Sequence, residues 1–175
     1  MTGRAIPTLR CATVADAALL TQLGEQTFLE TFDGTCPPAD MQLYLASAFT
    51  LARLTSELTD PRAVFLVAEI EGEPAGYAKL QCGEVPDCIA GTSPLELERL
   101  YVAQRWLGCG VGPALMQACL DYAKETGRQT MFLGVWENNF RAQAFYRKWN
   151  FEQVGDHVFM MGTDPQTDWW MERAL

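Results

Sequence analysis

Residues 107–112 read LGCGVG, with a glycine at every second position. An apolar run precedes this stretch, and Pro113 begins a helical apolar pattern after it, which indicates a turn from a strand into a helix. Such a turn presents several backbone N–H groups together at the positive end of the helix dipole, and the missing side chains let an anion approach them. The sequence therefore predicts a phosphate-binding turn; a glycine-rich turn that only connects the two elements is the alternative.

Two familiar phosphate loops are excluded by spacing. No lysine or serine follows Gly112, as a nucleoside triphosphate loop of the Walker type requires. The sixth position of a dinucleotide loop is occupied by Pro113, and only about sixty residues remain for a doubly wound domain. After the helix, residues 130–136 (TMFLGVW) read as another strand, so the loop lies in a βαβ unit.

The remaining pattern predicts one α/β domain over residues 1–175, without repeats or linkers. Expected helices cover residues 16–32, 39–48, 51–58 and 140–149, and expected strands cover residues 8–12, 95–103, 157–161 and 168–173, with a hairpin within residues 62–81. With 49% hydrophobic residues in 175, the chain can bury one substantial core.

Composition excludes several classes of protein. No apolar run approaches the ~20 residues of a membrane span, and the first ten residues lack the apolar region of an export signal, so we expect no membrane partner and a cytoplasmic location. The six cysteines include no C-x-x-C pair, and His157 is the single histidine, so we expect reduced thiols, no metal and no Cys–His catalysis.

Two stretches resemble a known family. The segments LERLYVAQRWLGCGVGPALMQACLDYA and GVWENNFRAQAFYRKWNF resemble the acetyl-CoA-binding core of the GNAT superfamily of N-acetyltransferases. The resemblance implies an α/β fold with a mixed, mostly antiparallel central sheet, splayed parallel strands in its middle and flanking helices. It also implies acetyl-CoA as cosubstrate. The ending HVFMMGTDPQTDWWMERAL is similar to the bacterial spermine/spermidine N-acetyltransferase branch, which implies a polyamine acceptor.

The resemblance also implies which residues hold acetyl-CoA. The strands over residues 96–102 and 130–135 are expected to part around the thioester. Two positions depart from the family: Leu107 replaces the usual Arg or Gln, and Asn150 replaces a glycine that asparagine can substitute in a left-handed turn. The expected cofactor-binding residues are Leu100, Tyr101, Val102, Leu107, Gly108, Cys109, Gly110, Val111, Gly112, Asn139, Tyr146 and Lys148.

Three side chains are the candidates for chemistry. By the resemblance, Tyr146 protonates the departing thiolate; a tyrosine packed in the core is the alternative. Glu96 is the first candidate for the base that accepts the proton of the amine, directly or through water. Glu98 lies two residues on and faces the same way, and a solvated strand face is the alternative for both. Asn139 either binds the pantetheine arm or caps the following helix, and the two roles are compatible.

Charge gives a separate indication about partners. Residues 99–148 carry seven basic and three acidic side chains, whereas the whole chain has a net charge of −9. The basic region favours a polyanionic cofactor, and the acidic remainder favours a small cationic amine and argues against nucleic acid, although solubility alone also explains an acidic surface. Other open acceptors are a protein N-terminus, another small amine or an antibiotic. A non-catalytic acetyl-CoA-sensing module and a homodimer are also open.

Overall fold

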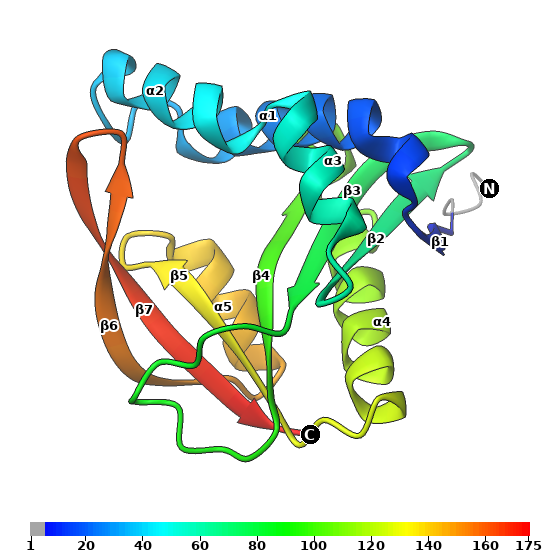
Figure 1. Cartoon of the computed structure of the whole chain (residues 1–175), viewed down its shortest axis with the longest axis vertical. Coiled ribbons are helices and arrows are strands. Elements are labelled where there is room, and N and C mark those ends of the chain that lie inside the picture. Colours follow the sequence, from blue (N-terminus) through cyan, green and yellow to red (C-terminus); the bar gives the residue numbers. More distant parts are fainter. Residues whose placement is uncertain (1–5) are drawn as a thin grey trace.

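The computed structural model describes residues 6–175; residues 1–5, part of the stretch searched for an export signal, lie outside them. Five α-helices and two short 3₁₀ turns, Val14–Asp16 and Gln104–Trp106, flank one sheet (Figure 1). The strands are β1 (Thr8–Cys11), β2 (Ala63–Ile70), β3 (Glu73–Gln81), β4 (Pro94–Val102), β5 (Thr130–Trp136), β6 (Glu152–Met161) and β7 (Asp164–Ala174). The helices are α1 (Ala17–Phe32), α2 (Pro38–Ala48), α3 (Leu51–Thr59), α4 (Val111–Glu125) and α5 (Phe140–Lys148).

The predicted elements agree with the structure to within two residues, except for the last two strands. β6 begins at Glu152 rather than His157, and β7 begins at Asp164 rather than Asp168. β6 is the edge strand of the sheet, and its first residues are exposed and polar, so they carry no strand-like apolar pattern. Among residues 6–175, no helix is long and apolar enough to cross a membrane.

The sheet has the order β1-β2-β3-β4-β5-β7-β6, and β4 and β5 form its one parallel pair. This pair is short: Pro94–Glu96 lie opposite Thr130–Phe132, and the two strands then part. The parting was expected from residue 96 onward, but Glu96 is still paired with Phe132, so the strands open one residue later. The mixed, mostly antiparallel sheet with parted parallel strands is the predicted fold class.

Each face of the sheet carries its own apolar core. On one face Leu95 and Leu97 of β4 pack with residues of α4, including Leu115. On the other face Phe65 and Tyr77 pack beneath α1, α2 and α3. Figure 1 shows these three helices gathered together, well apart from α4.

A β-bulge in β4 decides which side chains face which core. Leu80 of β3 lies opposite Leu97 while Lys79 lies opposite Arg99, so Glu98 is the extra residue. Before the bulge the odd-numbered leucines face α4, whereas after it Leu100 and Val102 do. Arg99 consequently points toward α3, on the same side as Glu98. The simple alternation expected for this strand therefore ends at Glu98.

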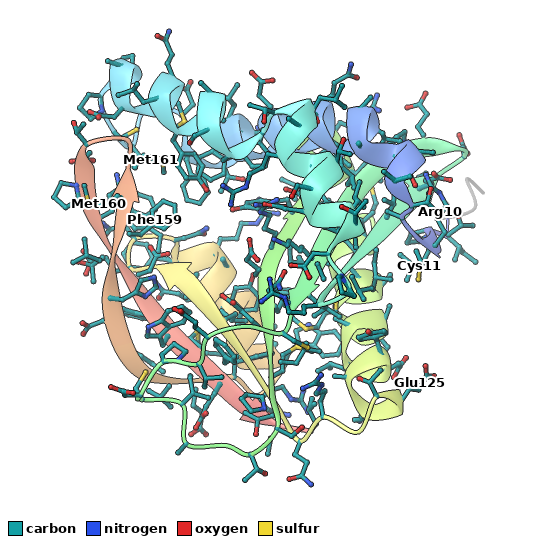
Figure 2. The ribbon with its side chains drawn as sticks, viewed as in Figure 1. Arg10, Cys11, Glu125, Phe159, Met160 and Met161 are labelled. Carbon is teal, nitrogen blue, oxygen red and sulfur yellow. The ribbon has the colours of Figure 1, made fainter. Side chains whose placement is uncertain are left out.

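The turn between β6 and β7 is fastened to α2. Asp40 Oδ1 accepts hydrogen bonds from the backbone N–H of Thr163 at 2.6 Å and from its hydroxyl at 2.7 Å. Gln166 Nε2 donates to the carbonyl of Thr35 at 3.2 Å. Figure 2 shows Phe159 and Met161 near this end of β6, beneath α2. The first two helices and the last hairpin thus close over the same end of the sheet.

Replacing Gly162 by alanine should test this closure. Its φ is +63°, and an added Cβ would lie 2.6 Å from the carbonyl oxygen of Asp40. Gly72, in the β2–β3 turn, has a φ of +80° with nothing within 4 Å of the added atom, which makes Gly72→Ala a matched control. We expect Gly72→Ala to lower the free energy of unfolding by about 1 kcal/mol and Gly162→Ala by about 3 kcal/mol in urea titrations. Equal losses would contradict close packing of the turn on α2.

Candidate active site

A cavity of about 830 Å³ lies where β4 and β5 part, bounded by α1, α2, the glycine loop, α5 and the last two strands. Most of the residues singled out from the sequence line it: Glu98, Leu100, Tyr101, Val102, Leu107, Gly108, Gly110, Gly112, Asn139 and Tyr146. Glu96, Cys109, Val111 and Lys148 are outside the lining. Val111 is instead buried in the core against α4's other apolar residues, and Lys148 is an exposed residue of α5.

The three positions of the loop are occupied by glycine for different structural reasons. Gly108 and Gly110 adopt φ values of +81° and +89°, and Gly110 is the N-cap of α4. Side chains are strained in this left-handed region, so these two positions require glycine. Gly112 has no positive φ, and a Cβ there would contact Phe145 at an ordinary 3.7 Å. Since Gly112 lines the cavity, a side chain there would narrow the cavity rather than break the helix.

The beginning of α4 has the donors that an anion needs. Val111 and Gly112 are the first two helical residues, so the helix itself supplies no acceptor for their N–H groups, and Pro113 has no N–H. The helix dipole adds partial positive charge at the same place. Arg141, at the start of α5, also lines the cavity. The residues present therefore fit a phosphate-bearing cofactor such as acetyl-CoA.

Asn139 has the geometry of both roles proposed for it. Its Oδ1 accepts a hydrogen bond of 3.1 Å from the backbone N–H of Ala142, which makes it the N-cap of α5. It also lines the cavity. The cap fixes the orientation of the amide at the cavity wall.

Tyr146 is a largely buried residue of the cavity wall. Its side chain is 8% exposed and packs against Phe145 and Phe151, yet it lines the cavity. Burial, and secondarily the charge of a Cys119 thiolate, raise the pKa of the Tyr146 phenol well above its usual range. The phenol is therefore protonated at neutral pH and can donate a proton inside the cavity.

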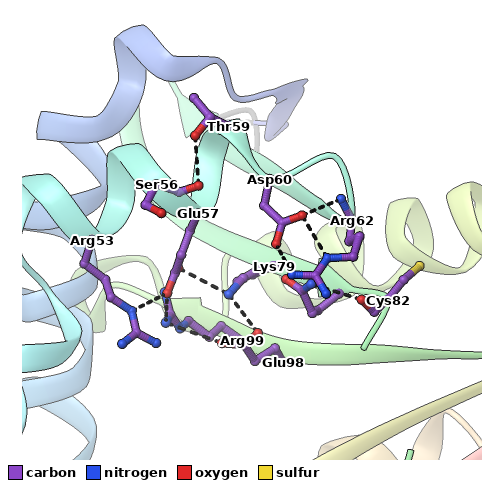
Figure 3. Close-up of polar contacts among 11 residues, drawn as sticks. Arg53, Ser56, Glu57, Thr59, Asp60, Arg62, Lys79, Cys82, Glu98 and Arg99 are labelled. Atoms are coloured by element: carbon purple, nitrogen blue, oxygen red, sulfur yellow. Dashed lines mark hydrogen bonds and ion pairs between the residues drawn. The ribbon is translucent and has the colours of Figure 1, made fainter. Parts of the chain in front are cut away.

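Five charged side chains form a network beside the cavity, in which Arg53 pairs with Glu57 at 2.8 Å (Figure 3). Lys79 Nζ lies 2.8 Å from Glu98 and 3.2 Å from Glu57, and Arg99 lies 2.9 Å from Glu57 and 3.4 Å from Glu98. Lys79 and Arg99 are buried, at 4% and 9% exposure. Glu98 is thus neutralised by two cations and fixed in place. Glu57 had no assigned role because it belongs to α3, forty residues away from β4 in the sequence.

Glu96 is in a different electrostatic situation from Glu98. It belongs to no ion pair within residues 6–175. Burial, and then the charge of Glu98, raise the pKa of Glu96 to about 7, although Lys79 partly opposes this. Its carboxyl group therefore changes protonation near neutral pH, as a general base should. Because its side chain is outside the cavity lining, its proton exchange with a ligand requires a bridging water or Glu98.

The other end of the cavity is a chamber of aromatic rings beneath α1 and α2. Phe28 and Tyr44 stack at 4.6 Å, and Phe32 meets Trp136 of β5 at 6.1 Å. Phe159 closes the chamber from β6, 5.4 Å from Tyr44. The rings of Phe28, Phe32, Tyr44 and Phe159 belong to or pack against the apolar core on this face, and together with Trp136 they also line the cavity.

The parted strands and the anion-binding loop define the class of protein that the resemblance implied, an acyltransferase that uses an acyl coenzyme A. Comparison of the sequence with known families is more specific. The chain belongs to the acetyltransferase (GNAT) family, whose model matches residues 25–151. The protein is therefore an acetyl-CoA-dependent N-acetyltransferase.

Individual relatives agree with this assignment. An uncharacterized N-acetyltransferase encoded in the pepI 3′ region of Lactobacillus delbrueckii subsp. lactis is 31% identical, over 87% of this chain and 88% of that protein. Aminoglycoside N(6′)-acetyltransferase type 1 of Stenotrophomonas maltophilia is 34% identical, over 91% of this chain and 95% of that protein. None of these names supports the narrower spermine/spermidine branch, which stays a prediction.

Solved structures share the fold. The PaiA N-acetyltransferase of Thermoplasma acidophilum, in complex with coenzyme A, has a TM-score of 0.77 at 20% identity over 97% of this chain and 99% of its own. YncA of Salmonella typhimurium, a putative acetyltransferase with acetyl-CoA as its cofactor, has a TM-score of 0.73 at 18% identity over 97% and 94%. Structural neighbours thus hold coenzyme A or acetyl-CoA on the same architecture.

The raised pKa of Glu96 predicts a pH-dependent effect on stability. In the unfolded chain Glu96 ionises near the ordinary 4.5, and in the folded protein near 7. The folded state binds the extra proton between these values, so stability decreases as the pH rises through this window, and the loss persists above 7. Glu96→Gln should therefore gain about 2 kcal/mol more stability, relative to wild type, at pH 8 than at pH 4.

Urea unfolding at both pH values measures this difference. Glu125→Gln, at the exposed end of α4 (Figure 2), removes the same charge and should show no comparable pH-dependent gain. An advantage of Glu96→Gln that is the same at both pH values would contradict the burial of an ionisable group.

Proposed function

We propose that the protein transfers the acetyl group of acetyl-CoA to a primary amine of a small cationic acceptor, with a polyamine such as spermidine or spermine as the expected class. The observation that carries this proposal is the continuous cavity, which runs from the glycine loop past Tyr146 into the aromatic chamber. The chamber accommodates an aliphatic chain between its rings. The net charge of −9 favours the approach of a cation.

In this proposal, different residues bind the cofactor, accept the proton of the amine and protonate the leaving thiolate. Acetyl-CoA supplies an acetyl group activated as a thioester. The N–H groups of Val111 and Gly112 would hold its phosphates, and the edge of β4 that β5 leaves unpaired would hold its pantetheine through Leu100 and Val102. Acetyl transfer by direct attack requires a neutral amine, so the protonated amine first loses a proton to Glu96 through water or Glu98. The neutral amine then attacks the thioester carbonyl, and the new C–N bond replaces the C–S bond. The Tyr146 hydroxyl then provides the proton that the departing sulfur needs.

A second acceptor class is favoured by one specific observation. The relative named aminoglycoside N(6′)-acetyltransferase type 1 aligns over nearly the whole chain. An aminoglycoside is also a small molecule with several amino groups. A protein N-terminus stays a further alternative; the β6–β7 turn, held to Asp40 of α2 and to Thr35, would border its approach to the aromatic rings. The six free cysteines support a reducing compartment such as the cytoplasm.

Mass spectrometry of reaction products identifies the acceptor class. The purified chain is incubated with acetyl-CoA and separately with spermidine, spermine, a lysine peptide and an aminoglycoside. We expect acetylated polyamine as the product. Acetylation of the aminoglycoside alone would instead identify an aminoglycoside as the acceptor class. Binding of acetyl-CoA without any acetylated product would favour the non-catalytic sensor.

Tyr146→Phe separates proton donation from binding. Removing the hydroxyl should lower kcat by about 100-fold while the dissociation constant for acetyl-CoA stays within about twofold, because the ring and its packing are retained. Steady-state kinetics and titration calorimetry measure the two quantities. Tyr122→Phe, on α4 and outside the cavity lining, is the matched control and should retain its rate. An unchanged kcat in Tyr146→Phe would remove Tyr146 from the mechanism.

A further inference from the structure

Asp168 is a cavity-lining carboxylate to which the sequence analysis gave no role. It belongs to β7, where its backbone lies opposite Trp136 of β5 and His157 of β6. Its Oδ2 lies 3.7 Å from where a Cβ on Gly134 would be, so the side chain extends along the face of β5 that carries Gly134. Trp136, two residues along on that face, contacts Phe32 of α1. Asp168 therefore points into the chamber beneath α1 and α2.

The carboxylate of Asp168 has no partner within residues 6–175, unlike the other acidic side chains that line the cavity. Glu98 is paired with Lys79 at 2.8 Å and with Arg99 at 3.4 Å. Glu30 accepts a hydrogen bond of 2.7 Å from the backbone N–H of Gln104. Asp168 thus retains its full capacity to accept hydrogen bonds from a ligand.

The surroundings of Asp168 leave its charge poorly compensated. The adjacent groups are aromatic: His157 stacks on Trp170 at 4.0 Å, and both rings border the same space at Gly134. Burial, and then the charge of Glu137, raise the pKa of Asp168 to about 6. A partly dehydrated carboxylate beside another acid is stabilised most by a cation that enters the cavity.

Asp168 and Glu98 border one chamber from different strands. Both carboxylates line the same cavity as Tyr44. Burial raises the pKa of Tyr44, the charges of Glu98 and Asp168 add to this, and the charges of Arg99 and Arg53 oppose it. Glu98 belongs to β4 and Asp168 to β7, with β5 between them in the sheet. The distance across β5 places Asp168 away from the edge of β4 where the acetyl group is held.

We infer that Asp168 binds a second positively charged group of the acceptor, distinct from the amine that reacts, so that the enzyme selects acceptors with at least two cationic groups. The inference rests on the proposed function and adds the residue that determines specificity. An ammonium group donates hydrogen bonds to the carboxylate, and the faces of Trp136 and Tyr44 offer cation–π contacts in the same chamber. The reacting amine stays outside this contact and is free to lose its proton.

Kinetics of the full-length protein with paired acceptors test the role of Asp168. Spermidine carries further charged amines, whereas n-butylamine offers one amine on an aliphatic chain. In Asp168→Asn we expect the KM for spermidine to rise at least tenfold with kcat within threefold, and kcat/KM for n-butylamine to change by less than twofold. The thermal midpoint should not fall, because the change removes an uncompensated carboxylate.

Asp156→Asn is the matched control. Asp156 lies on the neighbouring strand β6 and is exposed, so its replacement removes the same charge without reaching the cavity. It should leave the KM for spermidine unchanged. A similar rise in both variants would show that net charge, rather than contact with Asp168, attracts the acceptor, and would overturn the inference.

The remaining outcomes separate this inference from the proposed function. Acetylation of spermidine with the same KM in wild type and Asp168→Asn would overturn the role of Asp168 and leave the proposed function intact. If no amine is acetylated, the proposed function fails. Calorimetric titration of spermidine into the acetyl-CoA-bound protein then tests separately whether Asp168 contacts the acceptor. Binding that weakens tenfold in Asp168→Asn supports the contact; no binding, or equal binding, overturns it.

Discussion

The short pairing of β4 with β5 is the constraint on which the site depends. After Glu96 and Phe132 the two strands stop exchanging hydrogen bonds, so their facing edges keep unsatisfied backbone groups that need another partner. An extended cofactor arm is such a partner, and α4 begins close enough to bind its phosphates. Because the opening passes between the two strands, it connects the face covered by α4 and α5 with the face covered by α1 to α3. In the proposed function, one opening would therefore admit the cofactor from one side and the acceptor from the other.

The bulge at Glu98 determines how charge is distributed around this opening. It turns Arg99 and Glu98 toward α3, where Lys79, Glu57 and Arg53 complete a network of three cations and two anions. Burying the charges of Lys79 and Arg99 is costly, but the pairing within the network offsets much of that cost and holds Glu98 at the cavity wall. Two carboxyl groups near the opening lie outside the network, Glu96 and Asp168, and both have raised pKa values. Groups with uncompensated charge are expected where a proton or a cation must be accepted.

Local patterns predicted the fold and several of the residues that line the cavity; the roles of these residues stay predictions. The glycine loop, the cap at Asn139 and the position of Tyr146 are each encoded within a few consecutive residues, so the sequence alone places them. Asp168 and Glu57 were missed because each is significant only through tertiary contacts with segments that are distant in the sequence. The sequence analysis also missed that the side chains of β4 reverse their alternation after Glu98. A bulge depends on how β4 pairs with β3, so the sequence of β4 alone carries no signal for it. Cys109 and Val111 were assigned from their place in the loop, but they alternate with the glycines that line the cavity and instead pack in or against the core on the α4 face.

The boundaries of the family match explain why the reaction is better defined than the acceptor. The match covers residues 25–151, which include the glycine loop, Asn139 and Tyr146. It ends before β6 and β7, the hairpin that carries Asp168 and closes against Asp40 of α2. Membership of the family therefore rests on a match that includes the proposed acetyl-CoA segments, while β6 and β7 lie outside it. A relative named for an aminoglycoside can share the chemistry of this chain without sharing its acceptor, because the proposed contact at Asp168 lies on a strand that the family match does not include.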